Sequence, residues 1–358
     1  MIGVGTLAGL DATVDDDGTV HRGAIGLGWR VRTADEWLIP ARDGAVRQSR
    51  PFAAPIAHTA FRISGGDAVQ RVYALGESDA AVVVVEVEND SPNAIAVGFS
   101  VETSGRVTID DDGARVDGAP AVTFPRRPGA VEPDGLAVFP VPHRTSVRVA
   151  LSPRSGVDLR RLGGADAVRR AWDRVLDRGL RTELPEPLQS QVDAARADLL
   201  LAAPSADAFV ALESWGFDDR AVEVWERLGI RSRRATKRAR GDELLARTRA
   251  ALVREERGTV ELLPGFPSAW LGERLAAHDI PVQHGSCSFA LRWHGARPAL
   301  LWEVPAGATV RAPALDPSWS SNEAAGETLL AEPPTSLLAM GEATSVSGRA
   351  IDAPDQFS

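Results

Sequence analysis

Three carboxylates and one indole ring fall within seven residues of the chain, at Glu213, Trp215, Asp218 and Asp219. Hydrolysis of a glycosidic bond uses two carboxyl groups placed across that bond, and an aromatic face suits the apolar face of a sugar ring. The segment therefore predicts Glu213, Asp218 and Asp219 as catalytic candidates and Trp215 as a ligand contact. The structural alternative makes Trp215 a core residue, Asp218 a helix cap and Asp219 a partner of the helix dipole.

Tryptophans recur in the last third of the chain, where Trp270 and Trp293 are further ligand-binding candidates. An exposed aromatic ring is the kind that binds a ligand. Alternation along the segment, however, puts Phe289, Leu291 and Trp293 on one face of a strand. A core position for Trp293 is therefore the alternative.

No metal or cofactor motif emerges from the spacing of the histidines, the cysteine and the glycines. His278, His284 and His294 lie near Cys287, but their spacing fits no zinc-ligand pattern, so structural roles are expected for all four. The glycines at 23–28 do not match the dinucleotide-binding spacing. We expect no metal and no cofactor.

The segment Arg231–Arg240 carries six positive charges in ten residues. Such a segment could bind phosphate or nucleic acid, or it could be a solvated connection between helices. The formal net charge of −9 favours the second interpretation, because nucleic-acid-binding domains have a basic footprint. We expect no nucleic-acid partner.

The first 155 residues show the pattern of short antiparallel strands. Val82–Glu88 is a β-branched run ended by a turn, and 94–101 resumes as its partner strand. Thr13–Val20 and Thr108–Val116 each place Asp-Gly between β-branched residues, which predicts two hairpins. Many short strands separated by turns predict an antiparallel β-sandwich over 1–155.

Residues 160–256 change to a helical periodicity, with Val168, Trp172 and Leu176 on one stripe. Further helices are expected at 185–202, 206–215, 218–228 and 241–253. Strand signals return over 257–348, and 349–358 resembles a frayed tail. The predicted fold class is α+β, with an N-terminal sandwich, a short helical layer and a small C-terminal β-domain.

Composition places the chain among soluble globular proteins, with 358 residues, of which 44% are hydrophobic and 25% charged. The single cysteine excludes an internal disulfide. The N-terminus lacks a basic signal-peptide region, and no run approaches eighteen apolar residues. We expect a cytoplasmic protein with no membrane partner.

Three motifs of the last third occur in a characteristic order: Glu261-Leu-Leu-Pro-Gly-Phe-Pro-Ser-Ala-Trp270, Ser288-Phe-Ala-Leu-Arg-Trp-His-Gly295 and Leu300-Leu-Trp-Glu-Val304. That order resembles the closing β-domain of glycoside hydrolases and phosphorylases built on a six-hairpin α/α barrel, such as glucoamylase, maltose phosphorylase and α-fucosidase. The resemblance implies flanking domains around a catalytic barrel. A twelve-helix barrel needs roughly 300 residues, whereas 160–256 offers about 90, so most of the barrel is missing.

Three functional hypotheses follow from these observations. The first is a non-catalytic protein that binds carbohydrate or a protein partner. The second is a minimal hydrolase of glycans that uses Glu213 with Asp218 or Asp219. The third is a structural subunit of an oligomer, including a homo-oligomer, that completes its helical layer with another chain.

Overall fold

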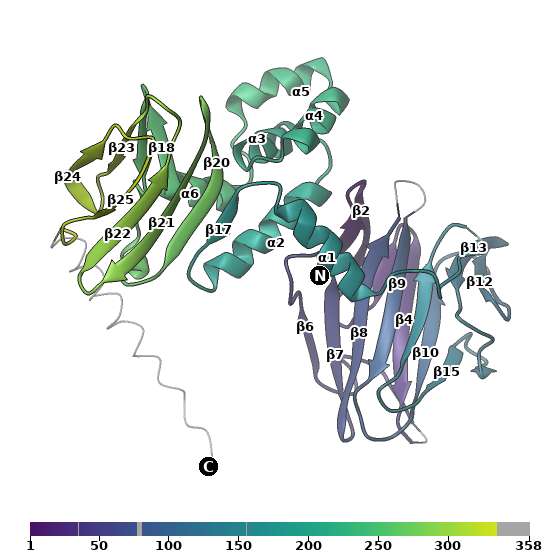
Figure 1. The fold of residues 1–358 in the computed structure, drawn as a ribbon. Coiled ribbons are helices and arrows are strands. Elements are labelled where there is room, and N and C mark those ends of the chain that lie inside the picture. The colour runs from purple at the N-terminus through teal and green to yellow at the C-terminus, as the bar shows by residue number, and fades with distance from the viewer. Residues whose placement is uncertain (35, 77–80, 155, 335–358) are drawn as a thin grey trace, which may run out of the picture. The chain divides into compact units, whose positions relative to one another are not determined.

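The computed structural model describes residues 1–34, 36–76, 81–154 and 156–334. The predicted tail and the last part of the predicted C-terminal β-domain lie outside these residues. The chain divides into two compact units, the first formed by Met1–Val175 with Arg196–Ala203, the second by Leu176–Ala195 with the residues from Pro204 onward. Mostly antiparallel sheets, with the helices confined to the middle of the chain, give the broad α+β class that the sequence predicts (Figure 1).

Two antiparallel sheets form most of the first unit. In spatial order, one sheet contains β1 (Ile2–Thr6), β2 (Gly9–Val14), β3 (Val20–Arg22), β4 (Ile25–Arg32), β10 (Ile95–Glu102), β15 (Ala137–Val141) and β14 (Ala130–Val131), and β5 (Trp37–Leu38) pairs with β4. The other contains β11 (Val107–Ile109), β12 (Gly113–Val116), β13 (Ala119–Thr123), β16 (Ser146–Leu151), β9 (Val82–Asn89), β8 (Gly66–Leu75), β7 (Ala57–Ile63) and β6 (Val46–Ser49).

Strand β9 shows how each sheet obtains an apolar face. Val83, Val85 and Val87 are fully buried and belong to one hydrophobic cluster to which both sheets contribute. Glu86 and Glu88 alternate with these valines, so their side chains leave the opposite face of the sheet. We call that opposite face the outer face of the second sheet.

The predicted pairing of 82–88 with 94–101 is wrong. Strand β9 pairs with β8 and β16, whereas β10 pairs with β4 and β15 in the other sheet. Both segments send apolar residues into the same core, so the chain can change sheets at the turn between them. Alternation identifies a strand but does not identify its neighbour.

The two Asp-Gly segments form hairpins as predicted. Strand β2 pairs with β3, and β11 pairs with β12. In the first hairpin Gly18 has a φ of 89°, and a Cβ there would lie only 2.6 Å from Nε1 of Trp29. Both the left-handed backbone and the close packing require glycine at this position.

The second unit contains two sheets and the helices from residue 204 onward. One sheet contains β17 (Arg181–Glu183), β20 (Leu275–Val282), β21 (Gly285–His294), β22 (Arg297–Glu303) and β25 (Ala325–Leu329), and the other contains β18 (Val253–Glu256), β19 (Thr259–Leu262), β23 (Thr309–Ala312) and β24 (Asp316–Ser321). The helices of this unit are α3 (Ala206–Ser214), α4 (Asp218–Arg227), α5 (Ile230–Ala235), α6 (Glu243–Leu252) and the 3₁₀ turns η2 (Thr236–Arg238) and η3 (Ser268–Trp270). Helix α1 (Ala165–Leu176) falls almost entirely in the first unit, and α2 (Leu188–Leu201) is divided between the two units. No helix among the described residues is both long and apolar enough to cross a membrane.

Helices α3 and α4 begin in different ways. Ser205 caps α3 by accepting a hydrogen bond from the backbone N–H of Ala208. The predicted cap at Asp218 is wrong, because Phe217 occupies the cap position and provides no side-chain hydrogen bond. Asp218 is instead the first helical residue of α4, where its charge favours the positive end of the helix dipole.

Two buried amides in the first unit differ sharply in how they are satisfied. The side chain of Asn89 donates to the carbonyls of Asn93 and Val141 and accepts from the backbone N–H and hydroxyl of Ser91. The side chain of Gln70 is also fully buried, but neither its oxygen nor its nitrogen has a hydrogen-bonding partner within the described part of the chain. A buried amide without partners costs free energy that an apolar side chain avoids.

We expect amide-to-apolar substitutions at these two sites to have opposite effects on the free energy of unfolding. Gln70→Met should raise it by about 1 kcal/mol, whereas Asn89→Leu should lower it by about 3 kcal/mol, because the second change strands several buried polar groups. Urea unfolding followed by circular dichroism measures both. Equal destabilisation by the two substitutions would contradict the expectation.

Candidate functional site

The predicted acidic residues lie on exposed positions at the junction of α3 and α4. Glu213 is exposed near the end of α3, and Asp218 and Asp219 are exposed at the start of α4. Partial burial and the neighbouring charge of Asp218 raise the pKa of Glu213. Glu213 and Asp218 are therefore electrostatic neighbours, but Trp215 between them is fully buried and offers them no stacking surface.

The three candidate tryptophans do not form one binding surface. Trp215 belongs to the core beneath α3, where its carbonyl accepts from the N–H of Leu180. Trp270 and Trp293 both contact Phe266, with ring centroids 5.9 and 6.5 Å away. Trp270 is buried and Trp293 half-buried, so the structure places these two rings in a packed aromatic cluster of the second unit.

The histidines and the cysteine of the C-terminal region lie on β20, on β21 and in the turn between them. Cys287 is buried, whereas His284 and His294 are exposed and His278 is half-buried. Among the residues that the structure describes, no group of three or more potential metal ligands comes together. Burial raises the pKa of the Cys287 thiol to about 12, so at neutral pH it is a protonated apolar side chain.

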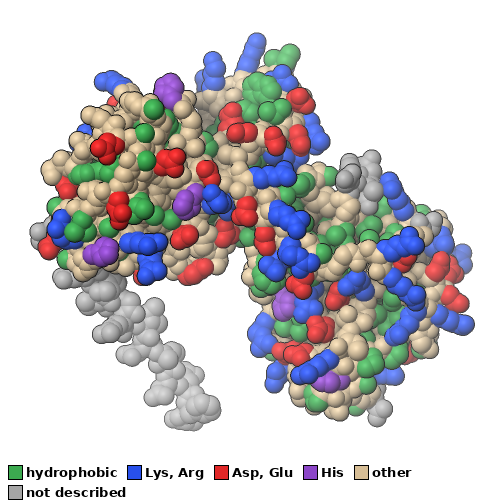
Figure 2. Space-filling model, viewed as in Figure 1, with side chains coloured by type: hydrophobic (Ala, Val, Ile, Leu, Met, Phe, Trp, Pro, Cys, Tyr) green, Lys and Arg blue, Asp and Glu red, His purple; other side chains and the backbone are tan. Residues whose placement is uncertain are grey.

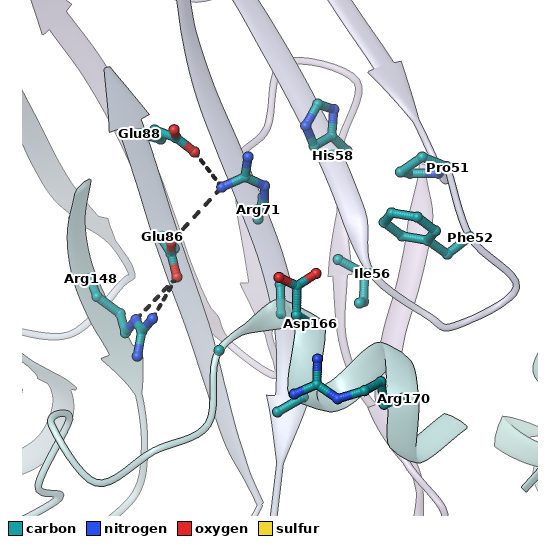
Figure 3. Close-up of a pocket in the computed structure, with 13 residues that line it drawn as sticks. Pro51, Phe52, Ile56, His58, Arg71, Glu86, Glu88, Arg148, Asp166 and Arg170 are labelled. Atoms are coloured by element: carbon teal, nitrogen blue, oxygen red, sulfur yellow. Dashed lines mark hydrogen bonds and ion pairs between the residues drawn. The ribbon is translucent and has the colours of Figure 1, made fainter. Parts of the chain in front are cut away.

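A cavity of about 670 Å³ lies on the outer face of the second sheet (Figure 3). The charged face of the sheet, the loop that carries Phe52 and the first turn of α1 enclose it. We call it the outer-face pocket. Its size falls in the range of pockets that hold small molecules.

Strand register builds one wall of this pocket from a row of side chains. His58 on β7 lies opposite Arg71 on β8, Arg71 lies opposite Glu86 on β9, and Glu86 lies opposite Arg148 on β16. Glu88 lies two residues along β9 on the same face. Opposite charges directly across strands stabilise a sheet, and the row presents hydrogen-bond donors and acceptors from four adjacent strands.

The carboxylate of Glu86 is the most buried charge of the row, with 13% of its side chain exposed. Arg148 donates to Oε2 of Glu86 through Nε and Nη2, at 3.1 and 2.9 Å, and the hydroxyl of Tyr73 donates to the same oxygen at 3.2 Å. Arg71 donates to Glu88 at 2.6 Å and lies 3.9 Å from Glu86. Burial, and next the charge of Glu86, raise the pKa of Tyr73, so the phenol remains a donor.

A second wall of the pocket, at the His58 end of the row, carries Phe52, whose side chain is exposed. Arg50 fixes the loop around it by donating to the carbonyls of Ala53 and Ala54 and to the carboxylate of Asp198. The guanidinium of Arg169 on α1 lies 5.3 Å from the centroid of the Phe52 ring, a cation–π contact. The ring is thus held at the pocket although it is not part of the core.

The remaining wall is the first turn of α1. The guanidinium of Arg148 donates to the carbonyl of Leu162 at 3.3 Å, which connects the sheet to the segment before this helix. Asp166 and Arg170 of α1 line the pocket. Figure 3 shows Arg71, Glu86, Glu88 and Arg148 on one side, His58, Pro51 and Phe52 on the other, and Asp166 and Arg170 of α1 below them.

The formal charges around the pocket cancel. Arg71, Arg148 and Arg170 balance Glu86, Glu88 and Asp166. Burial and the charge of Arg71 lower the pKa of His58, so His58 is neutral at pH 7 and can donate from one ring nitrogen and accept at the other. The pocket therefore offers no net attraction to an ion, but many directed hydrogen bonds beside one aromatic ring.

None of these pocket residues is a site candidate in the sequence. His58, Arg71, Glu86 and Arg148 are far apart along the chain, and only the register of four strands brings them together. The one local signal is Glu86 and Glu88 alternating with buried valines. That pattern indicates a charged outer face but not what that face is used for.

Comparison of the chain with protein-family models finds no matching family, and comparison with curated proteins finds no matching protein. The resemblance of the C-terminal motifs to barrel glycosidases therefore rests on those residues alone.

We expect Cys287 to react slowly with thiol reagents in the native protein. Its raised pKa keeps the thiolate fraction small at pH 8, and its side chain is buried. Absorbance after addition of Ellman's reagent should rise promptly only in the presence of denaturant. Stoichiometric reaction within seconds under native conditions would contradict this expectation.

We expect His58 to make the first unit sensitive to acid. Because its pKa in the folded protein is below its ordinary value of 6.5, the unfolded chain binds the proton more readily. The resulting stability is complete above pH 6.5 and is lost as the pH falls through the folded pKa. When the pH is lowered from 7.5 to 5, the free energy of unfolding of His58→Gln should fall less than that of the wild type, as measured by urea unfolding. An identical pH slope in both proteins would refute this role.

Proposed function

We propose that this chain is a non-catalytic carbohydrate-binding protein that holds an uncharged sugar in the outer-face pocket. The observation that carries the proposal is that the row of His58, Arg71, Glu86 and Arg148 and the exposed ring of Phe52 line one cavity of about 670 Å³. A sugar ring presents hydroxyl groups around its edge and C–H groups on its faces. The row supplies hydrogen-bonding partners for the hydroxyl groups, and Phe52 supplies an apolar surface for the C–H faces.

The balanced charges favour a neutral polyhydroxyl ligand over an ion. Three guanidinium groups and three carboxylates line the pocket. Hydrogen bonds between a hydroxyl and a charged group are stronger than those between neutral groups. A ligand of this kind can donate to the carboxylates and accept from the guanidinium groups without leaving an unpaired charge.

The same contacts favour binding over hydrolysis. Oxygen Oε2 of Glu86 already accepts from Arg148 and Tyr73, and Glu88 is paired with Arg71. A glycosidase needs one carboxyl group that gives up a proton during the reaction. Two ion-paired carboxylates are suited to accepting hydrogen bonds, which is the role that binding requires.

The resemblance to barrel glycosidases supports the same class of ligand. In this proposal, the first unit is the N-terminal β-sandwich of that architecture, the helices after it are a remnant of the barrel, and the C-terminal sheets are its closing β-domain. A chain that kept the flanking domains and lost most of the barrel would keep carbohydrate contacts outside the catalytic centre.

The test is a thermal-shift and calorimetry panel on the purified chain with maltose, trehalose, glycogen and fucosylated oligosaccharides. A ligand that binds the folded state should raise the melting temperature with concentration. Phe52→Ala should weaken its binding about tenfold, which corresponds to about 1.4 kcal/mol. The matched control is Val131→Ala, because Val131 is a similarly exposed apolar residue of the first unit that does not line the pocket.

Two results would overturn the proposal. One is a folded protein that none of the sugars stabilises. The other is sugar binding that Phe52→Ala and Val131→Ala weaken equally, since binding would then lie outside the pocket.

A second candidate function, hydrolysis at Glu213, has one observation in its favour. The charge of Asp218 helps to raise the pKa of Glu213, as expected for a general acid beside an ionised carboxylate. Product analysis by chromatography, with the wild type and Glu213→Gln, separates the two functions. Released sugar that disappears in Glu213→Gln would favour hydrolysis.

A further inference from the structure

We infer that the helices α4 and α5, with η2, form a symmetric contact between two copies of this chain. The acidic face of α4 in one copy would lie against the basic segment of α5–η2 in the other, and the reverse. The inference rests on charge, exposure and burial within residues 217–240 of the second unit.

Helix α4 is amphipathic, and its outer side is acidic. Ala221 and Val224 face the core. Asp218, Asp219, Glu223 and Glu226 are exposed, and we call them the acidic face. Val222 lies among them with 58% of its surface exposed, so this face combines negative charge with an accessible apolar side chain.

The segment that follows buries nothing of its own. Neither α5 nor η2 contains a buried residue. Its main attachment is Arg233, whose guanidinium stacks on the ring of Trp225 at 4.9 Å and donates to the Trp225 carbonyl. A helical segment without an apolar inner side gains little from its own packing, so a second surface would add to its stability.

The same segment carries the strongest positive charge of the chain. Arg231, Arg234, Lys237 and Arg238 are exposed, and we call them the basic segment. None of them has an ion-pair partner among the described residues. Ile230, at the start of α5, is 73% exposed. Figure 2 shows basic, acidic and hydrophobic side chains together on one side of the helical region around α3 to α5.

A second copy fits this surface better than a nucleic acid or a membrane. The acidic face and the basic segment carry opposite charges, although Glu223 is also paired with Arg220 at 2.6 Å within the chain. Each side includes one exposed aliphatic residue, Val222 or Ile230. A polyanion would meet the basic segment but would be repelled by the acidic face next to it. A two-fold axis allows both charge pairings to form at once, because the same patch then meets itself.

The contact should be weak and sensitive to salt. The ten side chains of the acidic face, the basic segment, Val222 and Ile230 are fewer than the roughly 20 to 30 residues on one side of a standard protein interface. Exposed charges are also screened over about 3 Å at 1 M salt. Sedimentation equilibrium of the full chain should show a dimer at 50 mM NaCl. The dimer dissociation constant should increase at least tenfold at 500 mM NaCl.

Charge reversal provides the decisive experiment. Asp219→Lys/Glu226→Lys and Arg231→Glu/Arg234→Glu should each be monomeric, because reversing two of the four charges on a patch cancels its net charge and removes the attraction in both pairings. An equimolar mixture of these two variants should dimerise again, since each reversed face then meets its opposite. Glu243→Lys and Arg247→Glu are matched controls on α6, where both side chains are highly exposed, and each should leave the dimer unchanged. Melting temperatures show that every variant is folded.

Three outcomes would overturn the inference. The first is a wild type that remains monomeric at 200 μM protein and 50 mM NaCl. Binding of the basic segment to RNA or acidic vesicles by such a monomer would count as the same outcome. The wild-type dimer could persist in both charge-reversed variants. The mixed variants could fail to associate although each is folded.

Discussion

The carboxylate of Glu86 is the group on which the outer face of the second sheet depends. It is largely removed from water, and a buried charge is tolerated only when it is paired and hydrogen-bonded. Its partners come from two neighbouring strands, Tyr73 and Arg71 from β8 and Arg148 from β16. Satisfying one carboxylate therefore fixes the relative register of three strands, and the position of the pocket wall follows from that register.

The other side of β9 imposes the same register independently. Val83, Val85 and Val87 must meet the core shared by the two sheets. A shift of one residue would place Glu86 in that core and expose the valines. Packing and electrostatics thus agree on a single arrangement, which keeps the charged row in place without contributions from a bound ligand.

The sequence predicts local structure well and long-range structure poorly, for reasons visible in particular residues. Asp-Gly turns and the Val168–Trp172–Leu176 stripe act over a few residues, and the two hairpins and α1 were found. The partner of β9 depends on which sheet the chain enters next, and no local pattern encodes that choice. The start of α4 at residue 218 agrees with the sequence, but the capping role of Asp218 does not, because an aspartate is equally favourable inside the first turn of a helix.

The outer-face pocket is hidden from the sequence for a related reason. A single sequence displays only spacing along the chain, which groups residues within short segments such as Glu213–Asp219. The outer-face pocket draws on residues from 51 to 170, and each of them alone has an ordinary charged or apolar side chain. Only the alternating Glu86 and Glu88 were visible in advance, and alternation of that kind is typical of any sheet with one solvated face.

The α3–α4 junction and the outer-face pocket each have only part of what a carbohydrate-hydrolysing site requires. At the α3–α4 junction, Glu213 has a raised pKa beside a second carboxylate, but Trp215 is closed off in the core. In the outer-face pocket an accessible aromatic ring and two carboxylates line one cavity, but arginines hold both carboxylates in ion pairs. Hydrolysis requires a transferable proton and a bound sugar at one point in space. Binding requires no transferable proton, and the pocket supplies the hydrogen-bonding groups and the aromatic surface that a bound sugar needs.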